Sequence, residues 1–392
     1  MAVLSVGVAW AALIGWLLLR IVRQFSAYRS MSLGRLPLAA APAAADVALI
    51  VPARNEIANI TDCLASLSAQ RGLGSRARII VVDDGSKDGT GEAVSRAALS
   101  DPRIMLIDAG RLPAGWMGKP HACWRGALAS DTEWLCFIDA DVRAAPEAIQ
   151  VAVAAATQHR IDFLSLNTFP ALVGFWERLI VPAALVLIAC VQDLRRVDDP
   201  ASHDISVNGQ FMLIRREAYF AAGGHGAVQA EVAEDKALAL RVKRQGWRYR
   251  MLGAEDLVQA RLYADFASLW QGFAKNATEI LGDGAATIAA ASAAMVLAWS
   301  ALLLPVLTGI LAVRQASDAA AAGFACALLG SISVLGLQLA STRRFRVPAA
   351  IGLLFPAGYT AIAALAWYSA ALYRGGRVSW KGRTYRRLDR RA

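Results

Sequence analysis

The sequence predicts an α/β fold with a doubly wound sheet and membrane segments at both ends of the chain. Between residues 46 and 282, short apolar runs of strand character alternate with helical segments, a pattern typical of a sheet covered by helices on both faces. Long apolar segments precede and follow this region. In total, 56% of the 392 residues are hydrophobic, which favours a membrane protein over a soluble one.

The apolar pattern places the elements of this domain in order. We expect strands at residues 47–51, 78–82, 104–107, 135–138, 163–166 and 211–214. We expect helices at residues 57–69, 92–99, 122–129, 234–244 and 266–281. A further segment, residues 175–191, is apolar but broken by Pro182, which favours an interfacial or groove-lining helix, with a plain buried helix as the alternative.

Residues 1–22 are predicted to anchor the chain in a membrane, because the segment is almost wholly apolar up to Arg20 and long enough to span a bilayer. It lacks the charged start and the clear cleavage site of a secretory signal. Residues 23–45 form a basic and Ala/Pro-rich linker. Because Arg20, Arg23, Arg29 and Arg35 follow the apolar run, the N-terminus is expected outside and the next domain on the cytoplasmic side of the cell (inner) membrane.

Residues 285–373 contain three apolar segments, 285–313, 319–340 and 347–373, each long enough to span a bilayer. Three spans after the anchor would leave the basic tail, residues 374–392, outside, against the charge rule. Pro305 and Pro356 allow one segment to be kinked or re-entrant, so the number of true spans stays open. The tail carries most of the net charge of +10, and contact with a membrane surface explains it better than nucleic acid.

The cysteines and histidines exclude two kinds of site. Five cysteines without a CxxC pair make a disulfide framework or a zinc site improbable, and the four histidines show no metal spacing.

A pair of aspartates ends the strand expected at residues 135–138. Asp139 and Asp141 stand one residue apart, where a buried strand opens into a loop. Two hard oxygen ligands at the carboxyl end of such a strand suit Mg²⁺ or Mn²⁺ carrying a phosphate. The alternative is an ordinary turn with solvated acids.

Polar loops follow the first two strands as well. After the first come Pro52, Ala53, Arg54, Asn55 and Glu56, where Asn55 is expected to cap a helix whose N-terminus favours an anionic ligand. After the second, Asp83 and Asp84 precede a Gly/Ser loop, which suits the hydroxyls and base of a nucleoside, whereas a GxGxxG dinucleotide pattern is absent. Asp88 and Thr90 have the alternative role of capping the next helix.

Further along the chain, Lys119 precedes another helix and is a candidate phosphate ligand. Glu234 and Asp235 open the helix expected at residues 234–244, where acids also complement the helix dipole. The functional interpretation is that Asp235 takes a proton from an attacking hydroxyl. Asn208, Gly209 and Gln210 precede a strand and are expected to approach the same site.

These pieces, in this order, resemble the family 2 glycosyltransferases over about residues 48–281. The resemblance implies a GT-A fold with a mixed doubly wound sheet, a nucleotide-sugar donor, a divalent metal and inversion at the sugar. It implies that residues 52–56, Asp83 and Asp84 hold the nucleotide, that Asp141 and Asp139 bind the metal, and that Asp235 is the base beside Glu234. Lys119 and Asp139 would also contact the donor.

One motif departs from the processive members of that family, which carry QxxRW. Here Gln271 is kept, but Lys275 and Asn276 stand where Arg and Trp would be, which favours transfer of a single sugar. Gly209, Gln210, Trp176, Gln271 and Lys275 are expected on the acceptor side. The segments 115–119, 175–178 and 380–385 are similar to hopene-associated and carotenoid glycosyltransferases of bacteria.

The resemblance therefore implies metal-dependent, inverting transfer of one sugar, from a donor expected to be UDP-linked, to a hydroxyl of a membrane lipid such as a hopanoid or carotenoid. Transfer to polyprenyl phosphate and processive polysaccharide synthesis are the alternatives among enzymes. A non-catalytic, membrane-anchored binding or scaffold protein is the alternative of another class.

Overall fold

The computed structural model describes residues 1–36, 44–191, 197, 202, 205–263, 265–281, 284–374, 377–380 and 383–386. The chain forms two compact units. The sheet unit comprises Ala27–Ala171 and Asp193–Leu262, and the helical unit comprises Met1–Ser26, Leu172–Gln192 and Tyr263–Ala392. Residues 37–43 of the expected linker 23–45 and the side chain of Asn276 lie outside the described residues, and residues 23–30 of that linker belong to the first helix.

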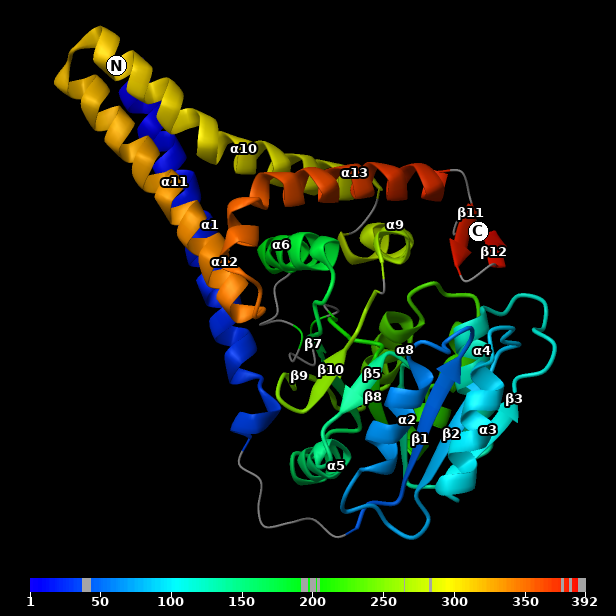
Figure 1. Ribbon diagram of the computed structural model, residues 1–392. Coiled ribbons are helices and arrows are strands. Elements are labelled where there is room, and N and C mark those ends of the chain that lie inside the picture. The colour runs from blue at the N-terminus through cyan, green and yellow to red at the C-terminus, as the bar shows by residue number, and fades with distance from the viewer. Residues whose placement is uncertain are drawn as a thin grey trace. The chain divides into compact units, whose positions relative to one another are not determined.

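The sheet unit is built on a seven-stranded sheet with the order β3-β2-β1-β4-β8-β6-β9 (Figure 1). Its strands are β1 (Val47–Ala53), β2 (Arg78–Asp83), β3 (Ile104–Asp108), β4 (Trp134–Ile138), β6 (Phe163–Asn167), β8 (Phe211–Arg215) and β9 (Tyr249–Gly253). The first four are parallel, whereas β8 runs antiparallel to both of its neighbours, so the sheet is mixed. All six predicted strands are present.

Helices cover both faces of this sheet because each central strand is apolar on both sides. In β1, Val47, Leu49 and Val51 pack with α2 (Ile60–Ser68) and α5 (Ala148–Gln158). The alternate residues of the same strand, Ala48 and Ile50, pack with α4 (Gly118–Leu128) and α8 (Glu234–Arg244). The period of two along a strand thus gives a three-layer α/β arrangement.

A smaller sheet with the order β5-β10-β7 was not predicted. Its strands are β5 (Val142–Ala144), β7 (Phe169–Pro170) and β10 (Val258–Ala260). Segments of two or three residues are too short to show a periodicity, so the pattern could not reveal them. Their position is informative, because β5 starts directly after Asp141, and β5 and β7 both pair with β10. The helices α3 (Thr90–Ser100) and α7 (Arg216–Ala221) complete the sheet unit.

Among the residues that the structure describes, three helices of the helical unit are long and apolar enough to cross a membrane: Ala2–Arg29, Gly284–Gln315 and Asp318–Arg344, which belong to α1 (Ala2–Ser30), α10 and α11. The last apolar segment, residues 347–373, for which a kinked or re-entrant form stayed open, is not one continuous helix. It divides into α12 (Ala349–Leu353) and α13 (Phe355–Arg374), and neither is among these candidates. Proline lacks an amide hydrogen and is tolerated in a first helical turn, which explains why a new helix begins beside Pro356.

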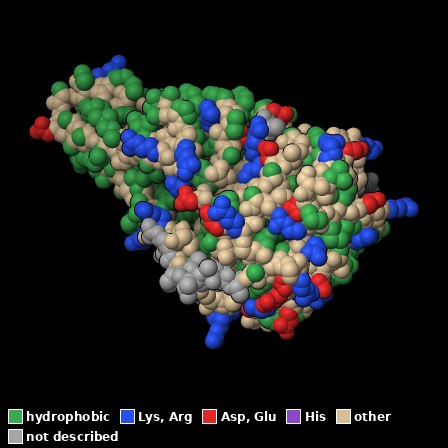
Figure 2. All heavy atoms as spheres, turned by 60° about the horizontal axis from the view of Figure 1, so that its bottom comes forward, with side chains coloured by type: hydrophobic (Ala, Val, Ile, Leu, Met, Phe, Trp, Pro, Cys, Tyr) green, Lys and Arg blue, Asp and Glu red, His purple; other side chains and the backbone are tan. Residues whose placement is uncertain are grey.

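Glycines allow α1 and α11 to approach closely. A Cβ atom on Gly7 would lie 1.9 Å from the carbonyl oxygen of Gly323, and one on Gly323 would lie 2.4 Å from that of Val3. Small residues at such contacts are a common means of packing helices in lipid. Apolar side chains of the long helices are exposed, among them Val6, Leu303 and Val306. Figure 2 shows many hydrophobic side chains, in green, on the face of the molecule that it draws.

The remaining helices of this unit are α6 (Phe175–Val191) and α9 (Phe266–Leu281), and a hairpin of β11 (Arg377–Trp380) and β12 (Arg383–Arg386) lies in the tail. Glu177 Oε2 accepts the amide hydrogens of Val173 (3.1 Å) and Gly174 (2.8 Å), which satisfies donors at the start of α6. At the other end, Arg20 Nη2 of α1 donates to the carbonyl of Val191 at 3.2 Å. Both contacts place charge where the helix dipole favours it.

Candidate active site

The candidate site lies where the order of the sheet reverses. From β1 the chain continues outward to β2 and β3, and then returns to place β4 on the other side of β1. The carboxyl ends of strands at such a reversal leave a crevice that typically binds a ligand. The loops after β1, β2 and β4 carry the polar residues that the sequence singled out.

The loops after β1 and β2 are joined by hydrogen bonds. The amide of Asn55 donates to Ser86 Oγ at 2.9 Å, that of Glu56 to Thr90 Oγ1 at 2.8 Å, and that of Ile57 to Asp88 Oδ2 at 3.0 Å. A guanidinium nitrogen of Arg54 also donates to the carbonyl of Asp84. These bonds fix the backbone of both loops before any ligand binds.

Asn55 does not cap a helix, which corrects the expectation from its position. Its backbone has a φ of +51°, and its Oδ1 accepts the amide hydrogen of Lys87 at 2.9 Å. The helix α2 instead begins at Ile60, after Asn59. An Asn tolerates the left-handed region better than other residues with a side chain, and the loop uses this tolerance to reach its neighbour.

The two aspartates after β2 differ in their surroundings. Asp83 Oδ1 accepts both the amide hydrogen (2.9 Å) and the hydroxyl hydrogen (2.5 Å) of Ser86, so this carboxylate helps to shape the loop. Asp84 is buried, with 4% of its surface exposed. The neighbouring Asp88 does serve the next helix, because its Oδ1 accepts the amide hydrogen of Thr90, the first residue of α3.

Lys119 is at the centre of the second part of the site. Its ammonium lies 2.8 Å from Asp139 Oδ1, 3.3 Å from Glu234 Oε1 and 3.5 Å from the carbonyl oxygen of Gly209. Burial lowers the pKa of Lys119, but the carboxylates of Asp139 and Glu234 outweigh it and hold the pKa well above the ordinary value. One permanent positive charge therefore joins residues from α4, β4 and α8.

Asp235 lies against Gly209, so closely that a Cβ atom on the glycine would be 2.6 Å from Asp235 Oδ2. Burial, followed by the negative charge of Glu234, raises the pKa of Asp235 from 3.8 to about 6. A carboxylate with such a pKa accepts a proton more readily than an ordinary one while it remains ionised at neutral pH. Asp235 is thus suited to act as a base.

Gln210 connects the two aspartates of the loop after β4. Its backbone carbonyl accepts the amide hydrogen of Asp139 at 3.1 Å, and its Nε2 donates to Asp141 Oδ2 at 3.1 Å. The other side of the Gln210 amide is held by Thr168, whose hydroxyl donates to Oε1 at 2.7 Å. Thr168 therefore fixes which end of the amide faces Asp141.

This hydrogen-bonded network extends away from the site and was not foreseen. Asn208 Oδ1 accepts the amide hydrogen of Gln210 at 3.0 Å, and Asn208 Nδ2 donates to Asn167 Oδ1 at 3.3 Å. Asn167 Nδ2 in turn donates to the hydroxyl of Tyr28 at 3.0 Å. Thr168, Asn167 and Tyr28 are common polar residues without a motif, so no pattern in the sequence distinguishes them.

A buried histidine was also missed. His225 is fully buried, its Nδ1 is 2.8 Å from the hydroxyl of Tyr219, and its ring packs on Phe137 of β4. Burial lowers its pKa to about 3, so it stays neutral. Its contacts with Tyr219 and Phe137 make it part of the core. The sequence did not reveal this role, because a single His outside any motif indicates no particular function.

The donors after β4 suit a divalent cation. Among the described residues, no group of three His, Cys, Asp or Glu side chains could hold a metal ion by itself. Asp139 and Asp141 nevertheless supply hard carboxylate oxygens, and Mg²⁺ is commonly held by one or two carboxylates together with the phosphates of a substrate. The residues present therefore fit a metal that arrives with a diphosphate.

The structure thus brings Lys119, Asp139, Glu234, Asp235 and Gly209 into one cluster and links Asp141 to it through Gln210. The residues of the loops after β1 and β2 form a second group, in which the two loops are joined by the hydrogen bonds described above. The other residues expected on the acceptor side, Trp176, Gln271 and Lys275, belong to the helical unit.

Comparisons with known proteins agree with this geometry. Residues 48–219 match the family described as glycosyl transferase family 2, and residues 134–367 match the one described as glycosyl transferase family group 2. A 4,4'-diaponeurosporenoate glycosyltransferase of Staphylococcus aureus is 26% identical over 234 residues, which cover 58% of this chain and 60% of that relative. The match thus spans less than two thirds of the relative's length.

A solved structure has the same fold. The mannosyltransferase PcManGT from Pyrobaculum calidifontis, in complex with GDP-Man and Mn²⁺, superposes with a TM-score of 0.54 at 18% identity and covers 94% of this chain and 98% of its own. At that identity the likeness concerns the fold alone. The mixed sheet, the acidic loops at its reversal point and the family matches together lead to one conclusion: the chain belongs to the family 2 glycosyltransferases and has the GT-A fold.

Proposed function

We propose that this glycosyltransferase moves a single sugar from a nucleotide-sugar to a hydroxyl of a membrane lipid, with inversion at the sugar carbon. The observation that carries the proposal is the cluster in which Asp235, with its raised pKa, lies beside Gly209, Glu234, Lys119 and Asp139. It combines a base with charges of both signs at the reversal point of the sheet.

The donor is a nucleotide-sugar, and a UDP-linked one is the form we propose. The loop residues 52–56 with Asp83 and Asp84 would enclose the nucleoside, because their backbones are already fixed by mutual hydrogen bonds. Asp139 and Asp141 would hold Mg²⁺ or Mn²⁺, which neutralises the charge of the leaving diphosphate when bound. Lys119 adds a positive charge on the same side.

The chemical step assigned to this chain's own residues is proton removal. Asp235 accepts the proton of the acceptor hydroxyl while the hydroxyl oxygen forms a bond to the sugar carbon. The bond between that carbon and the diphosphate oxygen breaks, and its electron pair leaves with the nucleotide. Attack on the face opposite the diphosphate inverts the configuration. Glu234 raises the basicity of Asp235 and is itself neutralised by Lys119.

A lipid acceptor such as a carotenoid or hopanoid is supported by two observations. One relative is a glycosyltransferase named for a carotenoid substrate, and the helical unit carries three helices able to cross a membrane. Trp176, Gln271 and Lys275 belong to that unit and are proposed to face the acceptor, together with Gly209 and Gln210 of the sheet unit.

The count of candidate spans supports a consistent orientation in the inner membrane. If α1 enters the cytoplasm, α10 and α11 lead out and back, so the sheet unit and the basic tail share the cytoplasmic side. The arginines near the C-terminal end of α1 and those at residues 343, 344 and 346 would then lie inside as well. A third C-terminal span would have left the basic tail outside, against the charge rule. In the proposed orientation α13 does not cross the membrane, so this conflict does not arise.

The test compares lipids from cells with and without the protein by mass spectrometry, together with acceptor-dependent release of UDP by the purified full chain in Mn²⁺. We expect a lipid heavier by one hexose, and we expect Asp141→Asn to abolish both signals, whereas the exposed Asp256→Asn leaves them unchanged. A long polymer as product, or transfer to a lipid phosphate, would contradict the proposed acceptor. Absence of any turnover would favour a binding or scaffold protein.

A further inference from the structure

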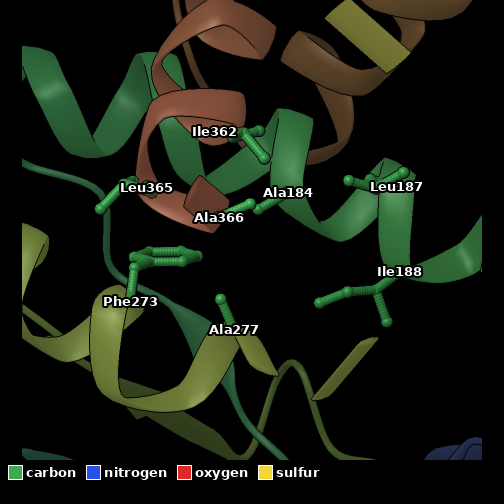
Figure 3. A pocket seen from close by; sticks show the side chains of 8 residues that line it. All are labelled: Ala184, Leu187, Ile188, Phe273, Ala277, Ile362, Leu365 and Ala366. Carbon is green, nitrogen blue, oxygen red and sulfur yellow. The ribbon is translucent and has the colours of Figure 1, made fainter. Parts of the chain in front are cut away.

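An apolar pocket lies within the helical unit, between α6, α9 and α13 (Figure 3). Its empty space is about 390 Å³ when the open solvent at its mouth is included, and about 30 Å³ of this is room for the centre of a water-sized sphere. Every described residue that lines it is apolar: Ala184, Leu187, Ile188, Phe273, Ala277, Ile362, Leu365 and Ala366. A cavity without polar partners does not hold water well, and it gains free energy when a hydrocarbon fills it.

A strip of aromatic rings borders this pocket. The ring centroids follow one another from Phe175 to Trp176 (5.3 Å), Phe266 (4.8 Å), Trp270 (5.6 Å) and Tyr368 (5.8 Å). Four of these five side chains are at least 40% exposed, which is unusual for rings of this size. Tryptophan and tyrosine concentrate where hydrocarbon meets the headgroups of a bilayer, so the strip marks that level on the helical unit.

The pocket begins one helical turn from the strip. Trp270 and Phe273 are three residues apart on α9, and Leu365 and Tyr368 are three residues apart on α13, so each pair shares one face of its helix. A molecule that places its polar end at the level of the rings would therefore extend its apolar part into the pocket.

The chain leads directly from the catalytic loops to the two helices that open the pocket. α6 starts at Phe175, soon after β7, and α9 starts at Phe266, soon after β10. Next to β10, the amide of Arg261 donates to the carbonyl of Asp141 at 3.0 Å, and Thr168 precedes β7 and holds Gln210. The pocket helices thus continue the strands that support the proposed metal ligand.

We propose that this pocket binds the hydrocarbon chain of the acceptor lipid. The inference rests on the proposed function and specifies which part of the chain recognises the apolar half of the acceptor. The occupant is an acceptor chain and not a soluble ligand, because the described lining side chains are all apolar and the aromatic strip marks a lipid interface. The catalytic unit then needs to recognise only the hydroxyl end.

The first experiment detects the occupant directly. The full chain in detergent is incubated with a 16-carbon alkyl chain bearing a photoreactive diazirine, and cross-linked peptides are mapped by mass spectrometry. We expect labels on the lining residues of α6, α9 and α13. Ala277→Phe and, from another helix, Ile188→Trp should each reduce this labelling about tenfold, the loss expected if an added ring excludes two methylene groups.

A matched control separates filling of the pocket from damage to the helix. Ala357→Phe adds the same ring at an exposed position of α13, more than one turn from the lining residues of that helix and from Tyr368, and should leave the labelling unchanged. Labels spread evenly over the outer helix faces, or labels that survive both pocket variants, would overturn the proposal.

The second experiment asks whether the occupant is the acceptor. With a lipid extract from cells lacking the protein as acceptor, Ala277→Phe should raise the KM for lipid about tenfold at unchanged kcat, since ground-state binding of the chain is lost. Binding of UDP with Mn²⁺, measured by calorimetry, should stay as in the parent protein. If the pocket is labelled but the KM for lipid does not change, the pocket holds bulk lipid and the proposal is wrong, whereas failure of UDP binding in the parent protein would instead refute the proposed function.

Discussion

In the sheet unit, the residues around Asp141 and Asp235 are held by hydrogen bonds between side chains and backbone, whereas in the helical unit helices approach through glycine and apolar contacts. The bond from Thr168 to Gln210 is typical of the first, and the contact of Gly7 with Gly323 is typical of the second. A reaction centre needs atoms placed within fractions of an ångström, which directional bonds provide. A lipid-exposed helix only needs a close fit, because its backbone bonds are satisfied internally.

The largest effect is expected for Asp235→Asn, which removes the proposed base. Transfer should fall by about a thousandfold, within the usual contribution of a general base. The variant should nevertheless be more stable than the parent above pH 6, because the fold raises the pKa of Asp235 from 3.8 to about 6 and so disfavours its ionised form. Below pH 3.8 both proteins carry a neutral group and the difference should vanish.

Thermal unfolding at pH 8 and at pH 5, alongside turnover of the lipid acceptor, measures both quantities. Asp256→Asn, on the exposed surface of the same unit, is the control. Retained activity in Asp235→Asn would remove the base from the mechanism.

A smaller effect is expected for Thr168→Val, which keeps the shape but loses the hydroxyl that orients Gln210 toward Asp141. Groups that orient metal ligands typically contribute about ten- to hundredfold to metal affinity. We therefore expect weaker binding of Mn²⁺, followed by its electron paramagnetic resonance, and Thr168→Ser should restore it. Equal affinity in the valine variant would show that Gln210 is oriented by other means.

The pH dependence of kcat/KM gives a more modest effect. Below pH 6 the rate should fall by about tenfold per pH unit, as the base becomes protonated. Glu234→Gln removes a negative charge beside Asp235, so the pKa of Asp235 should fall and the decline in rate should begin at a lower pH. If the acid limb of the kcat/KM profile has the same midpoint in Glu234→Gln as in the parent protein, a group other than Asp235 causes that limb.

The smallest effect on turnover is expected in the helical unit. Gly323→Leu should destabilise the packing of α1 on α11 by about 1–3 kcal/mol, the usual cost of overpacking, while each folded molecule keeps its activity. Gly336→Leu, on the same helix with open space around it, should have no effect on unfolding in detergent. If Gly323→Leu reduced turnover of folded protein as strongly as Thr168→Val, the two units would not differ as proposed.

The sequence predicted those parts of the fold that a regular pattern of apolar residues within one short segment indicates. The strands β1, β2 and β4 are apolar on both faces, and the helices α8 and α9 have the bounds that their pattern indicated. The acidic pairs were visible because they follow such strands directly. Their convergence with Lys119 and Gly209 depends on the strand order, which no single segment contains.

The errors and omissions have physical causes. Asn is a residue type that often caps helices, but the positive φ of Asn55 directs its side chain to the amide of Lys87 instead. The segment 347–373 is apolar throughout, yet Pro356 starts a new helix within it. Thr168 and Asn167 gained their roles only through contacts between segments distant in the chain, which a linear pattern cannot show.

The left-handed backbone at Asn55 restricts what other sequences can place there. Gly and Asp tolerate that conformation, whereas Val, Ile and Thr do not, since branching at Cβ brings atoms too close to the backbone. Homologues that share this loop are therefore expected to carry Asn, Gly or Asp at the position of Asn55, and not a residue branched at Cβ. Chains with a branched residue at that position would have to build the proposed nucleotide site from a differently folded turn.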